Sequence, residues 1–431
     1  MNIAGLTPLS QKAEYLRTVP AIRENCLRVF ALAQQGKLQY FDYHPEKEAD
    51  VAKFCVEIIK RDYGTDFSSI KPHGRWRHLD AGIPRVRPLL AKFQPIDARD
   101  EIKRTVDLFL VSVLLDAGAG NAWSYHEKSS GLRFGRSEGL GVASVHMFEE
   151  GFFSSDPKNQ PWRADAEGLS KITVERVAEA MQVSATNPMV GLEGRTSLLT
   201  NLSAALKASP EFFGADGRPG NIVDFLESES RIDTDGTRVV PVAALWHALI
   251  EGLNPIWPSR HVLAGKALGD VWPCGVLASS GSSEGDDFVP FHKLTMWITY
   301  SIVEVLQTVA TWRVEGLEDL TGLPEYRNGG LLVDLGVLTL KPNALPLDPA
   351  SGLPHAPPSH PAIVEWRALT VIELDRIADA IRAELGLTKE QLVLAQVLEG
   401  ATWKGGREIA KIKRPETSGP PIEIDSDGTV F

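Results

Sequence analysis

The stretch HKLTMWITYSIVEVLQT, residues 292–308, carries the clearest fold signal in the chain. Its apolar positions recur at the spacing of an amphipathic helix. One face of that helix would carry Leu294, Trp297, Ile298, Ser301, Ile302, Val305 and Leu306. Because an apolar helix face is stabilised by burial, the pattern predicts a helix packed against the protein core.

Outward from this segment, the C-terminal part of the chain shows further helical signals. A second apolar stripe recurs at steps of three and four and stops before Gly386, a typical helix end. Its members are Val371, Leu374, Ala378, Ile381 and Leu385. Thr388 and Gln391 then match a capping box, which predicts a further helix. That helix would turn Leu392, Ala395 and Leu398 inward.

Helices dominate the rest of the chain as well. Three more are predicted, at about 102–115, 173–181 and 195–207, whereas the best strand candidates, 331–333 and 336–340, are short. We therefore expect a mainly α fold, a multi-helix, two-lobed body with a few short strands. A helical core like that of the DNA glycosylases is one form that such a body could take.

The expected organisation has three parts: an N-terminal helical lobe over 1–100, a helical catalytic body over 101–413, and an extended tail over 414–431. No charged or low-complexity linker precedes residue 340, which favours closely packed lobes. The proline-rich segment 341–361 cannot continue a helix. It is an ordered wrapping segment or a border of the active site, with a simple spacer as the alternative.

Composition favours a cytoplasmic protein that acts on a small molecule. The chain has 431 residues, 43% of them hydrophobic, which is enough for a substantial core. A net charge of −11 disfavours nucleic-acid binding, which depends on clustered Lys and Arg. The three cysteines, Cys26, Cys55 and Cys274, form no CxxC pair, and the N-terminus resembles no signal peptide. We expect a reducing cytosol and no membrane contact; the sequence defines no oligomeric state.

The densest group of reactive side chains is LTGLPEYRNGGLLVD, residues 320–334, in which Glu325 is the natural chemical actor. Pro324 fixes the chain before this acid, and Tyr326 and Arg327 can orient a carboxylate or a substrate. Two glycines, Gly329 and Gly330, would let the backbone approach a ligand closely. The alternative is a surface turn with a solvated Glu–Arg pair.

A second cluster, DAGAGNAWSYHE at 116–127, follows an apolar helix. Its small residues beside Asn121, Trp123 and Tyr125 suit a pocket wall, although a structural turn between helices explains them equally well. The glycine spacing is not that of a Rossmann motif. In the nearby GRSEGLG, Arg136 and Glu138 could line the same pocket, but no GK[ST] completes a P-loop.

Several basic groups could hold a phosphate. RWRH at 75–78, followed by Arg85 and Arg87, and WKGGR at 403–407 are candidates, with ordinary surface charge as the alternative. Lys293, next to His292 at the start of the best helix, is favoured because backbone N–H groups there also attract an anion.

Other reaction chemistries have weak support in the sequence. The ten histidines include no HExxH motif, and His355 and His360 lack an acidic partner at ligand spacing. No G-x-S-x-G elbow points to a Ser–His–Asp hydrolase. We expect no metal and no cofactor.

Four stretches, FHKLTMWITYSIVEVL, LTGLPEYRNGGLLVDLGVL, LLDAGAGNAWSY and EGATWKGGREIA, resemble the uracil-catabolism family of fungi and bacteria, the fourth protein of the URC pathway. The likeness spans nearly the full chain. More remotely, FHKLTMW followed by LTGLPEYR resembles the queuosine-salvage N-glycosylases, where FYK and an ADYR-type string occur in the same order. The catalytic acid of those enzymes is Asp, whereas Glu325 occupies the matching position here, and its extra methylene would move the carboxylate.

The resemblance implies a substrate left after a uracil nucleotide has been opened: ribosylurea, with or without a 5′-phosphate. An N-ribosyl hydrolase would release urea and ribose or ribose phosphate, with Glu325 stabilising the oxocarbenium-like transition state and activating water. Asp334 is the reserve acid. Tyr326 and Arg327 would position the acid, Trp123 and Tyr125 would wall the substrate, and Lys293 with Arg136 would hold hydroxyls or phosphate. The alternatives are an amidohydrolase that attacks the ureido carbonyl and a non-catalytic scaffold or sensor of the pathway.

Overall fold

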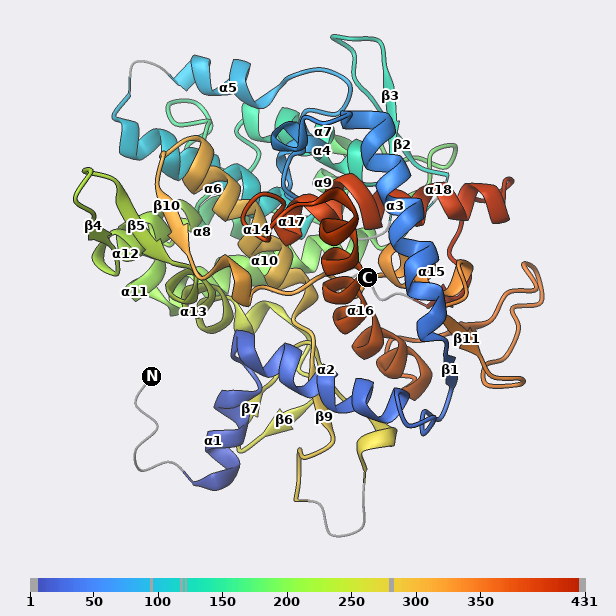
Figure 1. The fold of residues 1–431 in the computed structure, drawn as a ribbon. Coiled ribbons are helices and arrows are strands. Elements are labelled where there is room, and N and C mark those ends of the chain that lie inside the picture. The colour runs from blue at the N-terminus through green and yellow to red at the C-terminus, as the bar shows by residue number, and fades with distance from the viewer. Residues whose placement is uncertain (1–6, 94–95, 117–118, 121, 279–282, 426–431) are drawn as a thin grey trace.

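The computed structural model describes residues 7–93, 96–116, 119–120, 122–278 and 283–425. The predicted mainly α fold is confirmed (Figure 1). The α-helices are α1 Pro8–Tyr15, α2 Val19–Ala33, α3 Glu48–Tyr63, α4 Trp76–Leu79, α5 Val86–Phe93, α6 Ala98–Leu114, α7 Arg136–Glu149, α8 Ala166–Ser170, α9 Val174–Ala180, α10 Leu192–Ala208, α11 Pro210–Phe213, α12 Ile222–Ser228, α13 Val242–Gly252, α14 Lys293–Thr308, α15 Tyr326–Asp334, α16 Pro361–Leu385, α17 Leu394–Val397 and α18 Trp403–Lys413.

The strands are short and form only small sheets within the described residues. They are β1 Phe41–Tyr43, β2 Ser124–His126, β3 Arg133–Gly135, β4 Arg231–Ile232, β5 Arg238–Pro241, β6 Val262–Leu263, β7 Lys266–Ala267, β8 Val271–Pro273, β9 Phe288–Pro290, β10 Arg313–Glu315, β11 Leu338–Leu340, β12 His355–Ala356 and β13 Glu423–Ile424. The largest sheet has three strands, in the order β10-β5-β4. The helices, not the sheets, therefore build the core.

Helix α14 lies in the middle of the molecule, as its apolar pattern predicts (Figure 1). It is buried on every side from Thr295 to Leu306, and it packs against α6 and α13. Leu294, predicted on the buried face, is only half-buried because it precedes this enclosed part. The remaining predicted helices appear as α6, α9 and α10.

Helix α16 forms a second central element, and α2 and α3 pack along it (Figure 1). It begins ten residues before the predicted stripe, since Pro361 opens its first turn and the His360 side chain accepts a hydrogen bond from the N–H of Ala362. Thr388 and Gln391 exchange the predicted capping hydrogen bonds. These bonds form a turn, and the next helix starts only at α17.

One of the two strand predictions is wrong. Residues 331–333 lie inside α15, because the Glu325 side chain caps this helix and its leucines pack inward. The other prediction is confirmed in part, since β11 pairs antiparallel with β1 near the start of the chain. The short apolar run had no periodicity by which helix and strand could be told apart.

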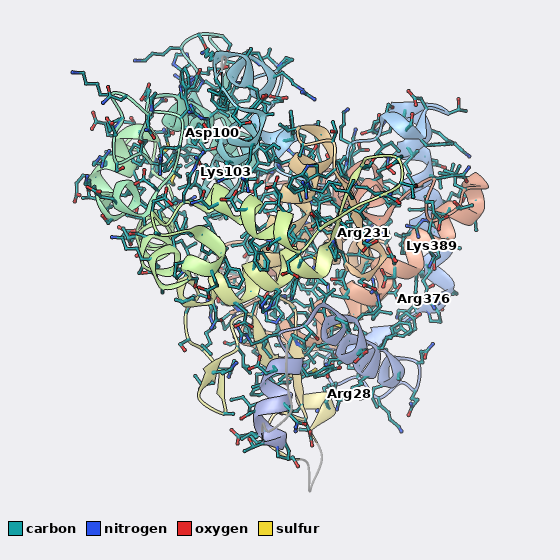
Figure 2. The ribbon with its side chains drawn as sticks, turned by 90° about the vertical axis from the view of Figure 1, so that its left-hand side faces the viewer. Arg28, Asp100, Lys103, Arg231, Arg376 and Lys389 are labelled. Carbon is teal, nitrogen blue, oxygen red and sulfur yellow. The ribbon has the colours of Figure 1, made fainter. Side chains whose placement is uncertain are left out.

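Ion pairs join segments that are distant in the sequence, and three of the residues that form them, Asp100, Lys103 and Arg376, are labelled in Figure 2. Lys103 of α6 lies 2.6 Å from Asp224 of α12, and Asp100 lies 2.7 Å from Arg218. Arg376 of α16 lies 2.8 Å from Glu48 of α3.

The proposed division into lobes stays a prediction. No helix in the described ranges is long and apolar enough to cross a membrane.

The C-terminal segment is tied to the proline-rich segment 341–361. Strand β12, within that segment, pairs in parallel with β13. The N–H of Glu423 donates to the carbonyl oxygen of Pro354 at 2.8 Å, and the N–H of Asp425 donates to that of Ala356 at 3.1 Å. Both segments are therefore ordered where they meet, whereas only the C-terminal one contributes residues to the cavity described below.

Candidate active site

Glu325 is held rigidly by the backbone of the helix that follows it. It is the N-cap residue of α15, and one carboxylate oxygen accepts the N–H of Arg327 at 2.7 Å while the other accepts that of Asn328 at 2.6 Å. These contacts satisfy helix donors that would otherwise lack partners. Only 8% of the residue is exposed. The capping geometry therefore fixes the carboxylate at one place.

Burial changes the proton affinity of this acid and of a nearby base. Burial raises the pKa of Glu325, while the two backbone donors and the charge of Lys293 oppose the rise. Burial also lowers the pKa of Lys293, against the charges of Glu325 and Asp116. Carboxylates and an ammonium group therefore share a poorly solvated space.

That space is a cavity of about 470 Å³, within the size range of small-molecule sites. Its wall is built from segments far apart in the chain. They are the turn before α4 and α4 itself (His73, His78), the segment after α6 (Asp116, Ala119, Gly120), the start of α7 (Arg136, Ser137), Val190, the first turns of α14 (Lys293, Trp297), the start of α15 with Leu323 (Glu325, Tyr326, Arg327), Trp403 of α18, and the C-terminal segment (Gly419, Pro420, Glu423, Ile424, Asp425).

Asp116 supplies a second carboxylate to this wall. Its Oδ2 lies 3.0 Å from Nη1 of Arg75, whose side chain is fully buried. The other oxygen, Oδ1, is buried and has no hydrogen-bond partner within the described ranges. The charges of Asp116 and Glu325 both act on Lys293 and on the hydroxyl group of Tyr326. The two acids therefore belong to one electrostatic unit.

Aromatic rings form another wall of the cavity. The His73 ring stacks on Trp297, and the His78 ring packs edge-on against both Trp297 and Trp403. Burial, together with the charges of Arg77, Arg75 and Arg407, lowers the pKa of His78 well below its ordinary value, which keeps the ring neutral. The faces of these rings give the cavity a flat, largely apolar wall.

The cationic side chains at the cavity are anchored by the C-terminal segment. Arg327 donates from Nη1 to the carbonyl oxygen of Ser418 at 2.8 Å, and Arg136 donates to that of Thr417 at 3.4 Å. Arg136 also adopts a left-handed backbone conformation, with φ of 51°, which is strained for a residue other than glycine. The C-terminal segment thus completes the cavity and holds two of its arginines.

Of the residues predicted for the site, Glu325, Tyr326, Arg327, Lys293 and Arg136 line the cavity together. Trp123, Tyr125 and Glu138 do not appear in its wall. Trp123 donates from its indole nitrogen to the carbonyl oxygen of Met181, and the Tyr125 ring stacks on His146. Glu138 forms an ion pair with Arg407 at 2.7 Å. Asn121 lies outside the described residues.

Asp334, the predicted reserve acid, lies at the opposite end of α15 from Glu325. It accepts hydrogen bonds on both oxygens from Arg414 and takes no part in the cavity wall. The two acids are nine positions apart along the helix, which is roughly 13 Å at 1.5 Å per residue. The role of Asp334 is therefore to form an ion pair that joins the end of α15 to Arg414, directly after α18.

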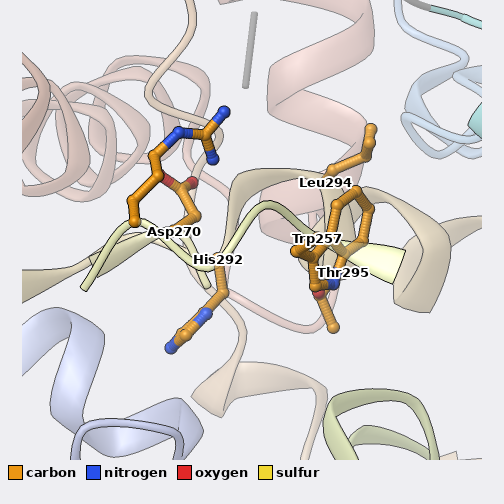
Figure 3. Close-up of a pocket in the computed structure, with 6 residues that line it drawn as sticks. Trp257, Asp270, His292, Leu294 and Thr295 are labelled. Carbon is orange, nitrogen blue, oxygen red and sulfur yellow. The ribbon is translucent and has the colours of Figure 1, made fainter. Parts of the chain in front are cut away.

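His292 lies at a different, much smaller pocket (Figure 3). That pocket has a volume of about 10 Å³, the space of a single water, and Trp257, Asp270, Leu294 and Thr295 contribute to it. Nε2 of His292 lies 2.8 Å from the carbonyl oxygen of Leu16. Asp270 accepts two hydrogen bonds from Arg367. The histidine therefore links the N-terminal segment to the start of α14.

The two glycines of α15 serve helix packing and not ligand approach, which corrects the expectation for them. A Cβ on Gly329 would meet the Trp366 ring at 2.7 Å, and one on Gly330 would meet Pro421 at 3.0 Å. Both positions need glycine, or nearly so, because α16 and the C-terminal segment pack directly on α15. Their role is to seat the helix that carries Glu325.

The predicted phosphate clamps are largely occupied by ion pairs. Arg77 contacts Glu399 at 2.5 Å, Arg85 pairs with Glu127 through both carboxylate oxygens, and Arg407 pairs with Glu138. Metal-ligating side chains also stay apart: within the described ranges, no group of three or more His, Cys, Asp or Glu could hold a metal ion.

Several contributors to the site were not predicted from the sequence, and two of them matter most for its chemistry. Asp116 was placed in a candidate pocket wall but was not considered as an acid, although a carboxylate directly after a buried helix is a signal for one. The C-terminal segment 419–425 was expected only as a tail. The glycine and two prolines at its start, Gly419, Pro420 and Pro421, carry no local sign of a tertiary partner.

Fold and cavity together define a mainly α protein with a buried, carboxylate-lined cavity of small-molecule size. The chain belongs to the family described as "Protein of unknown function (DUF1688)", whose model matches residues 15–431. It is 43% identical to "Uracil catabolism protein 4" of Lachancea kluyveri, over 97% of this chain and 98% of that protein. It is 40% identical to "Protein urg3" of Schizosaccharomyces pombe, over 96% and 98%. The resemblance to the uracil-catabolism family is thereby confirmed.

Proposed function

We propose that this protein is an N-ribosyl hydrolase of uracil catabolism that cleaves ribosylurea, or its 5′-phosphate, to urea and ribose or ribose phosphate. The relatives indicate a role in uracil catabolism, since one of them is named for that process. The observation that carries the reaction type is Glu325: a buried carboxylate, fixed by two backbone donors, in the wall of a small-molecule cavity.

Hydrolysis of the C1′–N bond builds positive charge on the sugar as the bond breaks. A buried anion whose position is already fixed stabilises that charge without further reorganisation. The electron pair of the broken bond goes to the ureido nitrogen, the oxygen of water bonds to C1′, and a proton from that water ends on the nitrogen. Glu325 would take the proton from water because burial raises its pKa toward the working range of a general base.

The other cavity residues suit the two halves of such a substrate. Lys293, Arg136 and Arg327 provide hydrogen-bond donors for hydroxyl or phosphate oxygens. Trp297 and Trp403 provide apolar surface against a sugar face. Burial of Glu325 and Lys293 would strengthen the charge interactions that these residues make with a substrate.

Product analysis tests the proposal. Purified protein is incubated with ribosylurea and separately with its 5′-phosphate, each with and without a chelator, and urea, ammonia and reducing sugar are quantified. Urea in a one-to-one ratio with reducing sugar is expected, with no effect of the chelator. Ammonia as the first product would point to an amidohydrolase, and binding of both compounds without turnover would point to a pathway scaffold or sensor.

A further inference from the structure

Asp116 is a buried acid at the cavity, and one of its carboxylate oxygens has no hydrogen-bond partner among the described residues. Its side chain is 5% exposed, and Oδ2 is paired with Arg75 at 3.0 Å. Oδ1 is buried, has no partner within the described ranges, and belongs to a residue that lines the cavity. A buried acceptor without a donor is costly, so an unused one at a cavity indicates the place of a ligand donor.

The surroundings of Asp116 hold its carboxylate in place. Arg75 is itself fixed, since Nε donates to the hydroxyl of Ser112 at 2.7 Å and the guanidinium lies over the Trp297 ring. Arg195, also fully buried, donates to the carbonyl oxygen of Leu115, next to Asp116 in the chain, at 2.6 Å. An ionised carboxylate only accepts hydrogen bonds, so the matching ligand group must be an N–H or O–H donor.

The two acids of the cavity are equipped differently. Both oxygens of Glu325 already accept backbone N–H groups, whereas Oδ1 of Asp116 has no hydrogen-bond partner in the part of the chain that the structure describes. Lys293 lies within the electrostatic reach of both. Glu325 therefore suits charge stabilisation at the sugar, and Asp116 suits recognition of a neutral group that is rich in donors.

We infer that Asp116 binds the ureido group of the substrate, through hydrogen bonds from the ureido N–H groups to Oδ1. The inference rests on the proposed function, because ribosylurea carries this group at the bond to be broken. It makes Asp116 a specificity-determining residue: a sugar without the ureido group would gain nothing from it. Arg75 acts through Asp116 and is a positioning residue.

The experiment measures binding by calorimetry with the full chain. The Glu325→Gln substitution is present throughout, so that turnover does not interfere with the binding measurement. The probes are ribosylurea and ribose, and the same pair with a 5′-phosphate. Adding Asp116→Asn should weaken binding of the ureido compounds by about 10- to 100-fold, the value of a hydrogen bond to a charged group, and leave ribose and ribose phosphate unchanged. An equal loss for both members of a pair, or no loss for the ureido compounds, would overturn the inference.

Controls separate this effect from misfolding. Asp107→Asn removes the charge of another fully buried acid, paired with Arg218 at 2.7 Å outside the cavity, and should leave all affinities unchanged. If Asp116→Asn unfolds because Arg75 loses its partner, the Arg75→Gln/Asp116→Asn double variant removes both charges and should show the same selective loss. Asp116-dependent ureido binding by a wild-type protein that produces no urea would refute the hydrolase proposal and leave this inference standing.

Discussion

Gly406 of α18 lies directly against the backbone carbonyl of Arg327 in α15, with no room for a Cβ between them. This contact brings the two helices together at the first turn of α15, where Glu325, Tyr326 and Arg327 face the cavity. The neighbouring Gly405 has only ordinary contacts, the nearest at 3.5 Å. The pair of glycines offers a matched test of how closely the helices must approach.

Gly406→Ala should destabilise the protein by about 1–3 kcal/mol, the usual cost of overpacking, and also reduce substrate affinity because Arg327 must shift. Gly405→Ala should be neutral or stabilising by up to about 1 kcal/mol, since alanine favours a helix. Denaturant unfolding measures the change in stability, and calorimetry measures the change in substrate affinity. Equal stability of the two variants would contradict this account of the helix contact.

Glu325→Gln should lower kcat by about 10²–10³-fold or more, because the charge that stabilises the transition state is lost while the side-chain size is kept. Glu318→Gln, an exposed acid a few residues earlier, is the matched control and should retain full turnover. Circular dichroism and thermal unfolding would establish that both variants fold. Full activity of a folded Glu325→Gln protein would remove Glu325 from the mechanism.

The acid limb of the pH profile should report Glu325. Burial raises the pKa of this carboxyl in the folded protein, and the ionised form is the active one. Activity should therefore rise as pH rises through that raised pKa, and the limb should lie at higher pH than for an exposed glutamate. Measuring kcat/KM from pH 4 to 9, with the residual activity of Glu325→Gln as reference, checks the sign. An identical limb in that variant would assign it to another group.

Glu423→Pro should weaken substrate binding several-fold, because proline removes the N–H that donates to Pro354 and so loosens the β12–β13 pairing beside the cavity. Glu423→Ala keeps this N–H and removes the same side chain, so it is the matched control. KM should rise more in the proline variant than in the alanine variant. Equal values would show that the side chain, and not the strand pairing, matters at this border.

Local patterns were sufficient to predict the main helices. The stripe of 292–308 and the stripe that ends at Leu385 predict α14 and α16, because apolar spacing of three and four residues is a property of the chain alone. Glu325 could be singled out in the same way, because proline, tyrosine, arginine and glycine lie within a few residues of it in the sequence.

Local patterns failed where a neighbour distant in the sequence decides the outcome. Residues 331–333 have the composition of a strand, but they lie in the helix that Glu325 caps. Gly329 was expected to let the backbone approach a ligand, but Trp366 packs directly on it. Asp334 and Asp116 are both acids next to apolar runs. Only the tertiary structure shows that Asp334 forms an ion pair with Arg414 and that Asp116 lines the cavity.

Local patterns predict that the chain is mainly helical, which family it resembles, and which short stretch carries the leading acid. The tertiary structure alone decided which side chains meet: it joined Asp116, Lys293 and Glu325 around one cavity and closed it with the C-terminal segment. The physical reason is one of range. Helix formation depends on residues a few positions apart, whereas a cavity depends on how whole helices pack, and no local pattern encodes that packing.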